Sequence, residues 1–183
     1  MRKFILVVIM ISFYSTIVLA DGVTDAERCV REYYLNLEQI INNPKGDQYK
    51  SYTNIINDKL FADREILIPN DLKLVSVDEN PTEDNLLTIL LYTQKLQKMA
   101  DKGNLSISIS DIKSQVENKC TGIKDNNNAQ NYIKNDRIIV TLTKKITYLG
   151  KEKIFIDKIT YYSGKKKIVG ITSNAYSYTV EDI

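Results

Sequence analysis

Residues 138–171 read IIVTLTKKITYLGKEKIFIDKITYYSGKKKIVGI, and this stretch decides the fold. Apolar and polar residues alternate through Ile138–Tyr148, Lys153–Tyr162 and Lys167–Ile171, which is the period of a strand with one buried face. The segments between them, Leu149–Glu152 and Ser163–Lys166, contain glycine beside charged residues, as hairpin turns do. The pattern predicts a three-stranded antiparallel meander.

Two amphipathic helices are expected well ahead of this meander. Thr24 and Glu27 have the spacing of a capping box, with the threonine at the cap. Apolar residues then recur with helical period: Val30, Tyr33, Tyr34, Leu37, Ile40 and Ile41. Asn42–Gly46 ends this helix, and a second helix is expected over Asp47–Ala62. Its inner side carries Tyr49, Tyr52, Ile56 and Leu60.

The middle of the chain is less regular. Glu65–Pro69 and Leu72–Val77 are short and apolar, and either could be a strand. Asn80–Glu83 resembles a helix N-terminus, which predicts a third helix over Leu86–Met99. Leu105–Ile109 alternates between leucine or isoleucine and serine and predicts another strand.

Two polar segments have no predicted element. Asn118–Asn135 is expected to be a loop, and the tail Ser173–Ile183 has no clear partner. No repeat or linker divides the chain. The whole predicts one α+β domain, with helices at the front and an antiparallel meander at the end.

The N-terminus predicts export. Met1–Ala20 combines a basic start, a compact apolar run and small residues before a cut between Ala20 and Asp21, as in a secretory signal peptide. The alternative is an uncleaved membrane anchor, since about 17 uncharged residues lie near the lower limit for spanning a bilayer. The expected mature protein, residues 21–183, is soluble in a periplasm or outside the cell and meets a membrane only during export.

Charge and composition argue against two classes of function. The chain has 25 basic and 23 acidic residues, so removal of Arg2 and Lys3 with the signal leaves 23 of each. A neutral domain is not expected to bind nucleic acid, which normally selects a basic excess. The chain has no histidine, so any mechanism with an imidazole base or ligand is excluded.

The two cysteines, Cys29 and Cys120, suggest a disulfide in an exported protein. It would close a loop of about 90 residues and contribute about 4 kcal/mol in the loop-entropy model. The alternative is two separate thiols. A zinc site is not expected, because two cysteines without histidine do not complete a tetrahedral ligand set. The sequence indicates no metal and no cofactor.

The order of elements resembles the NTF2-like, cystatin-like superfamily. The local similarity lies in Ile159–Ile171, a strand, a glycine-containing turn and a second strand, although Lys166 stands where such proteins often have tryptophan. The resemblance implies a curved sheet that wraps around the helices and leaves a pocket at its open end. It also implies that a tyrosine and an aspartate in this cone could serve an isomerase or lyase, as in the ketosteroid-isomerase type.

Within this chain, Asp157 is the carboxylate set among the alternating residues of the meander, but the strand alone leaves open which face is buried. The candidate tyrosines are Tyr33, Tyr34, Tyr52, Tyr92, Tyr148, Tyr161 and Tyr162. For each of them, packing is the ordinary role. No catalytic residue is therefore assigned, and Asp157 is the single weak candidate.

The resulting expectation is an exported, non-catalytic domain that binds a small apolar ligand or a protein partner. The open end of the cone or the exposed sheet would provide the binding surface. One special form is a small inhibitor or immunity-type protein. The alternative from another class is the cone-pocket isomerase or lyase that uses tyrosine and aspartate.

Overall fold

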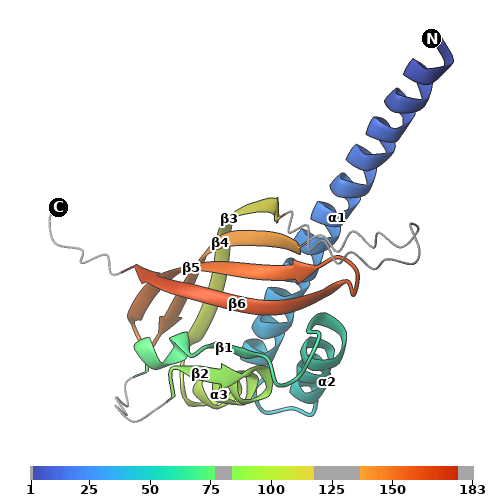
Figure 1. Ribbon diagram of the computed structural model, residues 1–183. Coiled ribbons are helices and arrows are strands. Elements are labelled where there is room, and N and C mark those ends of the chain that lie inside the picture. Colours follow the sequence, from blue (N-terminus) through green and yellow to red (C-terminus); the bar gives the residue numbers. More distant parts are fainter. Residues whose placement is uncertain (1, 77–83, 118–136, 177–183) are drawn as a thin grey trace, which may run out of the picture.

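The computed structural model describes residues 2–76, 84–117 and 137–176 of the chain, with side chains from residue 22 to residue 174. The fold is α+β, as predicted (Figure 1). Helix α1 (Arg2–Asn42) packs on a four-stranded antiparallel sheet, and the smaller elements α2, α3, β1 and β2 lie together at one end.

The large sheet confirms the predicted meander and adds a strand to it. Its order is β3 (Leu105–Glu117), β4 (Arg137–Tyr148), β5 (Lys151–Tyr162) and β6 (Lys167–Tyr176), with every neighbour antiparallel. In the turn between β4 and β5, Leu149 and Gly150 both have positive φ, 48° and 84°. A two-residue hairpin turn with both central residues in this region matches the twist of the strands, which explains the glycine here.

The tail prediction was wrong in its first part. Ser173–Tyr176 continues β6, and these residues pair with Ile154–Asp157 of β5. The alternation of side chains fades after Ile171, so the sequence pattern stops before the strand does. Backbone pairing with an already formed neighbour extends β6 without that pattern.

The first helix starts at a different residue from the one predicted. Thr24 lies inside α1 and not at its N-terminus, because the helix continues upstream to Arg2. The segment Phe4–Ala20 contains neither glycine nor proline, so nothing in it interrupts the helix. The predicted apolar stripe is confirmed, since Val30 and Leu37 are fully buried. Val30 and Leu37 belong to the buried core together with Tyr33, Tyr34 and Ile40.

The second predicted helix is present but irregular. It begins as α2 (Gln48–Asn54) and continues as a π-helix, η1 (Ile55–Leu60), that buries Ile56 and Leu60. Tyr49 and Tyr52 are only partly buried.

The middle segments form a small lobe at the end of the sheet. Strand β1 (Leu67–Pro69) pairs antiparallel with β2 (Leu86–Thr88). The second possible strand, Leu72–Val77, was a wrong prediction, because Asp71–Leu74 form a 3₁₀ helix, η2, that turns Leu72 into the core. The predicted helix N-terminus at Asn80–Glu83 and the predicted loop Asn118–Asn135 lie outside the described residues.

Helix α3 (Ile89–Lys102) starts three residues later than predicted. Leu86–Thr88 are in strand β2, and the Thr88 hydroxyl caps α3 by accepting the backbone N–H of Leu91 at 3.3 Å. A threonine at the cap satisfies a free N–H of the first turn, so it sets the boundary that apolar content alone did not.

Candidate functional site

The inward faces of β4 and β5 place two charged residues in the core. On β4 the buried positions are Ile138, Val140, Leu142, Lys144, Ile146 and Tyr148. On β5, Phe155, Asp157 and Ile159 point inward, whereas Lys158 is exposed. The face that the sequence left open is therefore decided: Asp157 is fully buried, with an exposed fraction of 0%.

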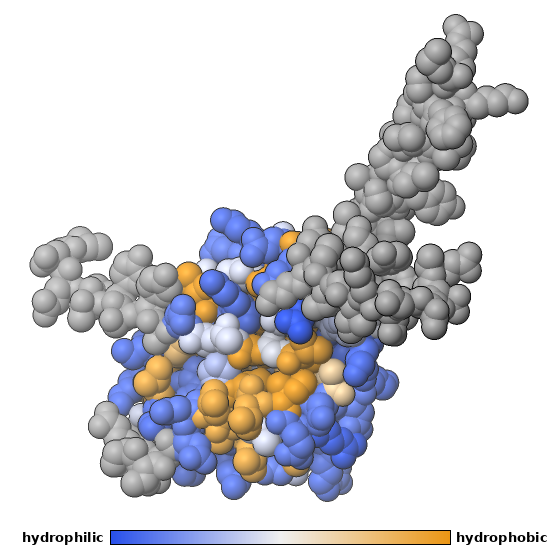
Figure 2. All heavy atoms as spheres, viewed as in Figure 1, coloured by the Kyte–Doolittle hydropathy of each residue, from blue (hydrophilic) through white to orange (hydrophobic). Residues whose placement is uncertain are grey.

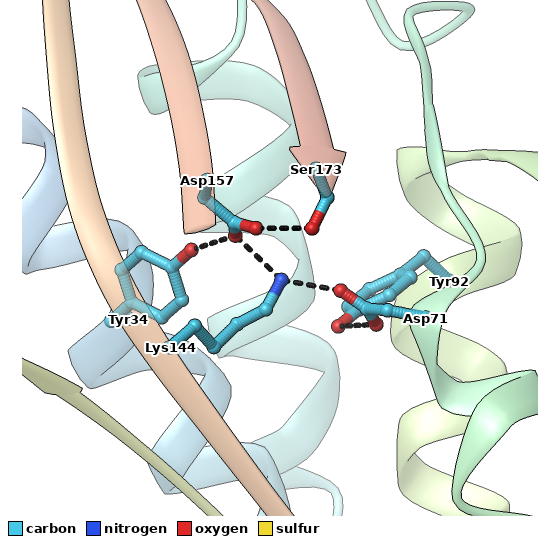
Figure 3. Close-up of polar contacts among 6 residues, drawn as sticks. All are labelled: Tyr34, Asp71, Tyr92, Lys144, Asp157 and Ser173. Carbon is cyan, nitrogen blue, oxygen red and sulfur yellow. Dashed lines mark hydrogen bonds and ion pairs between the residues drawn. The ribbon is translucent and has the colours of Figure 1, made fainter. Parts of the chain in front are cut away.

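Asp157 accepts hydrogen bonds from three side chains (Figure 3). Its Oδ2 accepts the hydroxyl of Tyr34 at 2.6 Å and Nζ of Lys144 at 2.5 Å. Its Oδ1 accepts the hydroxyl of Ser173 at 2.5 Å. The donors come from α1, β4 and β6, so this carboxylate joins the long helix to three strands of the sheet.

Lys144 has a second carboxylate partner in the small lobe. Its Nζ also donates to Oδ2 of Asp71, in η2, and forms an ion pair with it. Oδ1 of Asp71 accepts the hydroxyl of Tyr92, in α3, at 3.0 Å. The same ammonium lies 5.4 Å from the ring centre of Phe155, within the range of a cation–π contact. We call Tyr34, Asp71, Tyr92, Lys144, Asp157 and Ser173 the charged cluster.

The charged cluster is buried and its formal charges do not balance. The side chains of Lys144, Asp71 and Asp157 are 5%, 3% and 0% exposed. Two carboxylates thus face one ammonium, with a formal excess of one negative charge. Hydroxyl donors offset part of this excess, because each carboxylate also accepts at least one tyrosine hydroxyl.

Burial and neighbouring charge shift the pKa values of Asp71, Lys144, Tyr34 and Tyr92. Burial raises the pKa of Asp71 above its usual value of 3.8, although Lys144 and Tyr92 act against this rise. Burial alone would lower the pKa of Lys144, but Asp71 and Asp157 overcome that effect and raise it above 10.5. The pKa values of Tyr34 and Tyr92 also lie well above 10, first because both are buried and then because carboxylates are close.

These shifts predict a loss of stability at alkaline pH. A group whose pKa is higher in the folded state keeps its proton longer there, so the free energy of unfolding falls as the pH rises between the unfolded and the folded value. Lys144, Tyr34 and Tyr92 all act in this direction above pH 10. Each contributes at most about 1.4 kcal/mol per pH unit.

Urea unfolding at a series of pH values between neutrality and strong alkali measures this effect. The midpoint is expected to drop progressively above pH 10, the ordinary value for tyrosine. A midpoint that stays constant through this range would show that the tyrosines and Lys144 titrate as in the unfolded chain.

The arrangement favours a structural role over catalysis. Tyr34 and Asp157, both named as candidates from the sequence, do come together. Asp157 is already engaged by three donors, so both of its carboxylate oxygens are occupied by side chains of the protein itself. The charged cluster connects α1, η2, α3, β4, β5 and β6 and offers no exposed carboxylate to a substrate.

Sequence reasoning missed three members of the cluster. Lys144 did carry a signal, because it occupies a buried position in the alternation between Leu142 and Ile146. Asp71 and Ser173 carried none, since each lies in a short polar context typical of a surface loop. Their roles depend on residues 73 and 16 positions away in the chain.

The other candidate residues do not join the cluster. Tyr33 packs edge-on against Phe61 with ring centres 5.3 Å apart, and Tyr148 and Tyr161 are buried in the sheet. Tyr52 and Tyr162 are partly exposed. Tyr33, Tyr148 and Tyr161 therefore have the packing role expected for each candidate tyrosine.

Cys29 is buried under the π-helix, with its sulfur 4.0 Å from the carbonyl oxygen of Leu60. Burial raises the pKa of its thiol to about 11. Cys120 lies outside the described residues, so the Cys29–Cys120 disulfide stays a prediction. Within residues 22–76, 84–117 and 137–174, no group of acidic or cysteine side chains is placed to hold a metal ion.

A second feature is an exposed apolar surface on the small lobe. It consists of Leu67, Leu74, Leu86, Leu90 and Leu91, which are 40–54% exposed. These residues belong to β1, η2, β2 and the first turn of α3, and hydrophobic surface gathers in this region in Figure 2. We call these five residues the leucine patch.

Comparisons of the chain with protein-family models, with curated proteins and with solved structures each found no match. The NTF2-like resemblance therefore stays a prediction. In the part of the chain whose side chains are described, no helix is long and apolar enough to cross a membrane.

Proposed function

We propose that the chain is an exported, non-catalytic interaction domain that binds a protein partner through the leucine patch. The observation that carries the proposal is the gathering of five half-exposed leucines on one lobe. Single exposed apolar residues are ordinary on a protein surface, but a contiguous group of them marks an interaction site. A protein partner with a matching apolar surface would cover them.

The charged cluster supports this proposal because it holds the lobe in place. Asp71 lies in η2 beside Leu74, and Tyr92 follows Leu90 and Leu91 in α3. Both Asp71 and Tyr92 are tied to the sheet through Lys144. A docking surface on a fixed support loses less conformational entropy on binding than one on a mobile segment.

Export is part of the same proposal. All buried residues of α1 with described side chains begin at Ala26, after the predicted cut between Ala20 and Asp21. Removal of Met1–Ala20 would therefore leave all of these buried residues of α1 in the mature protein. The Tyr34–Asp157 hydrogen bond favours the isomerase or lyase alternative, but the closed cluster around it argues for the binding role.

Site-specific photo-crosslinking in the native host tests the proposal. A photoreactive phenylalanine analogue placed at Leu67 or Leu90 is expected to give one discrete adduct with another protein. Leu35 on α1 and Leu149 in the β4–β5 turn are matched controls, because they are 57% and 52% exposed but belong to other elements. Adducts of equal yield at all four positions would contradict the proposal.

A variant completes the test. Leu91→Lys is expected to remove the adduct formed at Leu67 and to change the free energy of unfolding by less than about 0.5 kcal/mol, as surface substitutions do. An unchanged adduct in this variant would place the partner elsewhere.

A further inference from the structure

The two edge strands of the large sheet, β6 and β3, differ in how well their outer backbone groups are protected from pairing with another strand. Beside β6, the chain forms a parallel bridge between Phe61 and Ile168, and the N–H of Ala62 donates to the carbonyl oxygen of Ile168 at 2.9 Å. On the opposite side, β3 pairs with β4 alone in the sheet that the described residues form. One side of β3 therefore has backbone groups without a strand partner.

The first half of β3 lacks the usual defences of an edge strand. Natural edges are blunted by charges, proline or bulges, which prevent pairing with another chain. Leu105–Ser110 contains no charged residue and no proline. The protective features begin only at Asp111, which has a φ of 52° at a break in the register with β4, and at Lys113 beyond it.

The side chains of this segment are exposed in a way that fits a further strand. Ser106, Ser108 and Ser110 lie on the exposed outer face. Ile107 and Ile109 point to the core side but remain only partly buried. An additional strand beside β3 would cover more of these two isoleucines.

The segment Ser106-Ile107-Ser108-Ile109-Ser110 reads the same in both directions. In antiparallel pairing of two identical strands about a two-fold axis at Ser108, Ile107 faces the partner subunit's Ile109, and Ser106 faces the partner subunit's Ser110. Apolar residues then meet on one face and hydroxyls on the other. Such self-complementarity is what a two-fold dimer interface requires.

We propose that β3 is a dimerisation edge, at which two copies of the chain pair antiparallel about Ser108 and join their four-stranded sheets into one. The bulge at Asp111 ends the ladder and keeps the charged second half of the strand out of it. The leucine patch takes no part in this pairing, because none of its residues is in β3.

Sedimentation velocity of the purified full chain, in detergent if the N-terminal segment requires it, tests the proposal. The wild type is expected to be a dimer at micromolar concentration. Ser108→Lys places two like charges directly opposite each other at the axis, so it should give a monomer with an unchanged circular dichroism spectrum. Thr172→Lys adds the same charge at an exposed position on the other edge strand and should remain dimeric.

A cysteine scan tests the register. Ser108→Cys should form a disulfide-linked dimer under mild oxidation, identified by mass spectrometry of the linked peptide, because the two side chains face each other at the axis. Ser110→Cys alone should not, since its opposite residue is the partner subunit's Ser106. A monomeric wild type, a dimeric Ser108→Lys variant, or a Ser110→Cys dimer without a Ser108→Cys dimer would each overturn the proposal.

Discussion

Lys144→Met is expected to lower the free energy of unfolding by about 3–5 kcal/mol, as removal of one partner from a buried ion pair does. The substitution keeps the length and the apolar stem of the side chain but removes the ammonium. Asp71 and Asp157, which are 3% and 0% exposed, would then face each other in the core without a cation between them. Hydroxyl donors remain, but they do not balance two negative charges away from water.

The neighbouring residue is a matched control for this prediction. Lys145 lies on the same strand, points to the opposite face and pairs with Glu152 at 3.2 Å, with 47% of its side chain exposed. Lys145→Met should therefore change stability by less than about 1 kcal/mol, the range of surface ion pairs. Urea unfolding of both variants gives the two free energies of unfolding. The comparison requires that the free energy depends on urea concentration with the same slope in both variants. Equal losses in the two variants would contradict a buried cluster.

Asp157→Asn removes the charge of this side chain but keeps its shape. Asparagine can still accept from Tyr34 through its oxygen, while its amide faces the hydroxyl of Ser173, which can accept. It also removes the excess negative charge of the cluster. We therefore expect a smaller loss than for Lys144→Met, and a partial recovery of stability when Asp157→Asn is added to Lys144→Met. Additive losses in the double variant would show that the two residues do not interact.

Phe155→Ala is expected to cost about 3–5 kcal/mol, because it leaves a cavity in a packed core. Phe155 is 1% exposed and lies directly across from Lys144 in the register of β4 and β5. Loss of the ring removes core contacts and also the aromatic face near the ammonium, 5.4 Å from its centre. The charged cluster then loses both the aromatic contact of Lys144 and the packing of the core beside it.

Ile156 is the control for the second prediction. It follows Phe155 in β5, points to the outer face and is only partly buried. Ile156→Ala should cost clearly less than Phe155→Ala in urea unfolding, because the side chain leaves no enclosed cavity behind. Phe155→Leu should fall between the two, since leucine refills part of the space. A larger loss of stability for Ile156→Ala than for Phe155→Ala would show that the face of β5 with Phe155 is not the one in the core.

Much of the fold was predictable from local patterns. The alternation over residues 138–171 predicted three strands that the structure confirms, and the stripe from Val30 to Ile40 predicted the buried face of α1. These patterns report which side of an element leaves water, and that depends on residues close together in the chain. Where the pattern was short, prediction was poorer: η2 was taken for a possible strand, and β2 was included in the following helix.

The candidate site was predictable only in part. Asp157 was the weak candidate and Tyr34 one of seven candidate tyrosines, but nothing in the sequence paired the two, and their contact joins residues 123 positions apart. Lys144 occupies a buried position in the alternation of β4, so its burial could have been predicted from the sequence. Asp71 looks like an ordinary loop residue until η2 folds against the sheet.

The sequence by itself determined the α+β class, the meander and the apolar face of the first helix, because hydrophobic periodicity acts within each element. It also made imidazole chemistry impossible. Only the tertiary structure decided that Asp157 lies inside, that Lys144 joins it to Asp71, and that five leucines from four elements of the small lobe are half-exposed. Those facts depend on how distant segments meet, and the pairing of buried charges is set where strand register and helix packing bring them within hydrogen-bond distance.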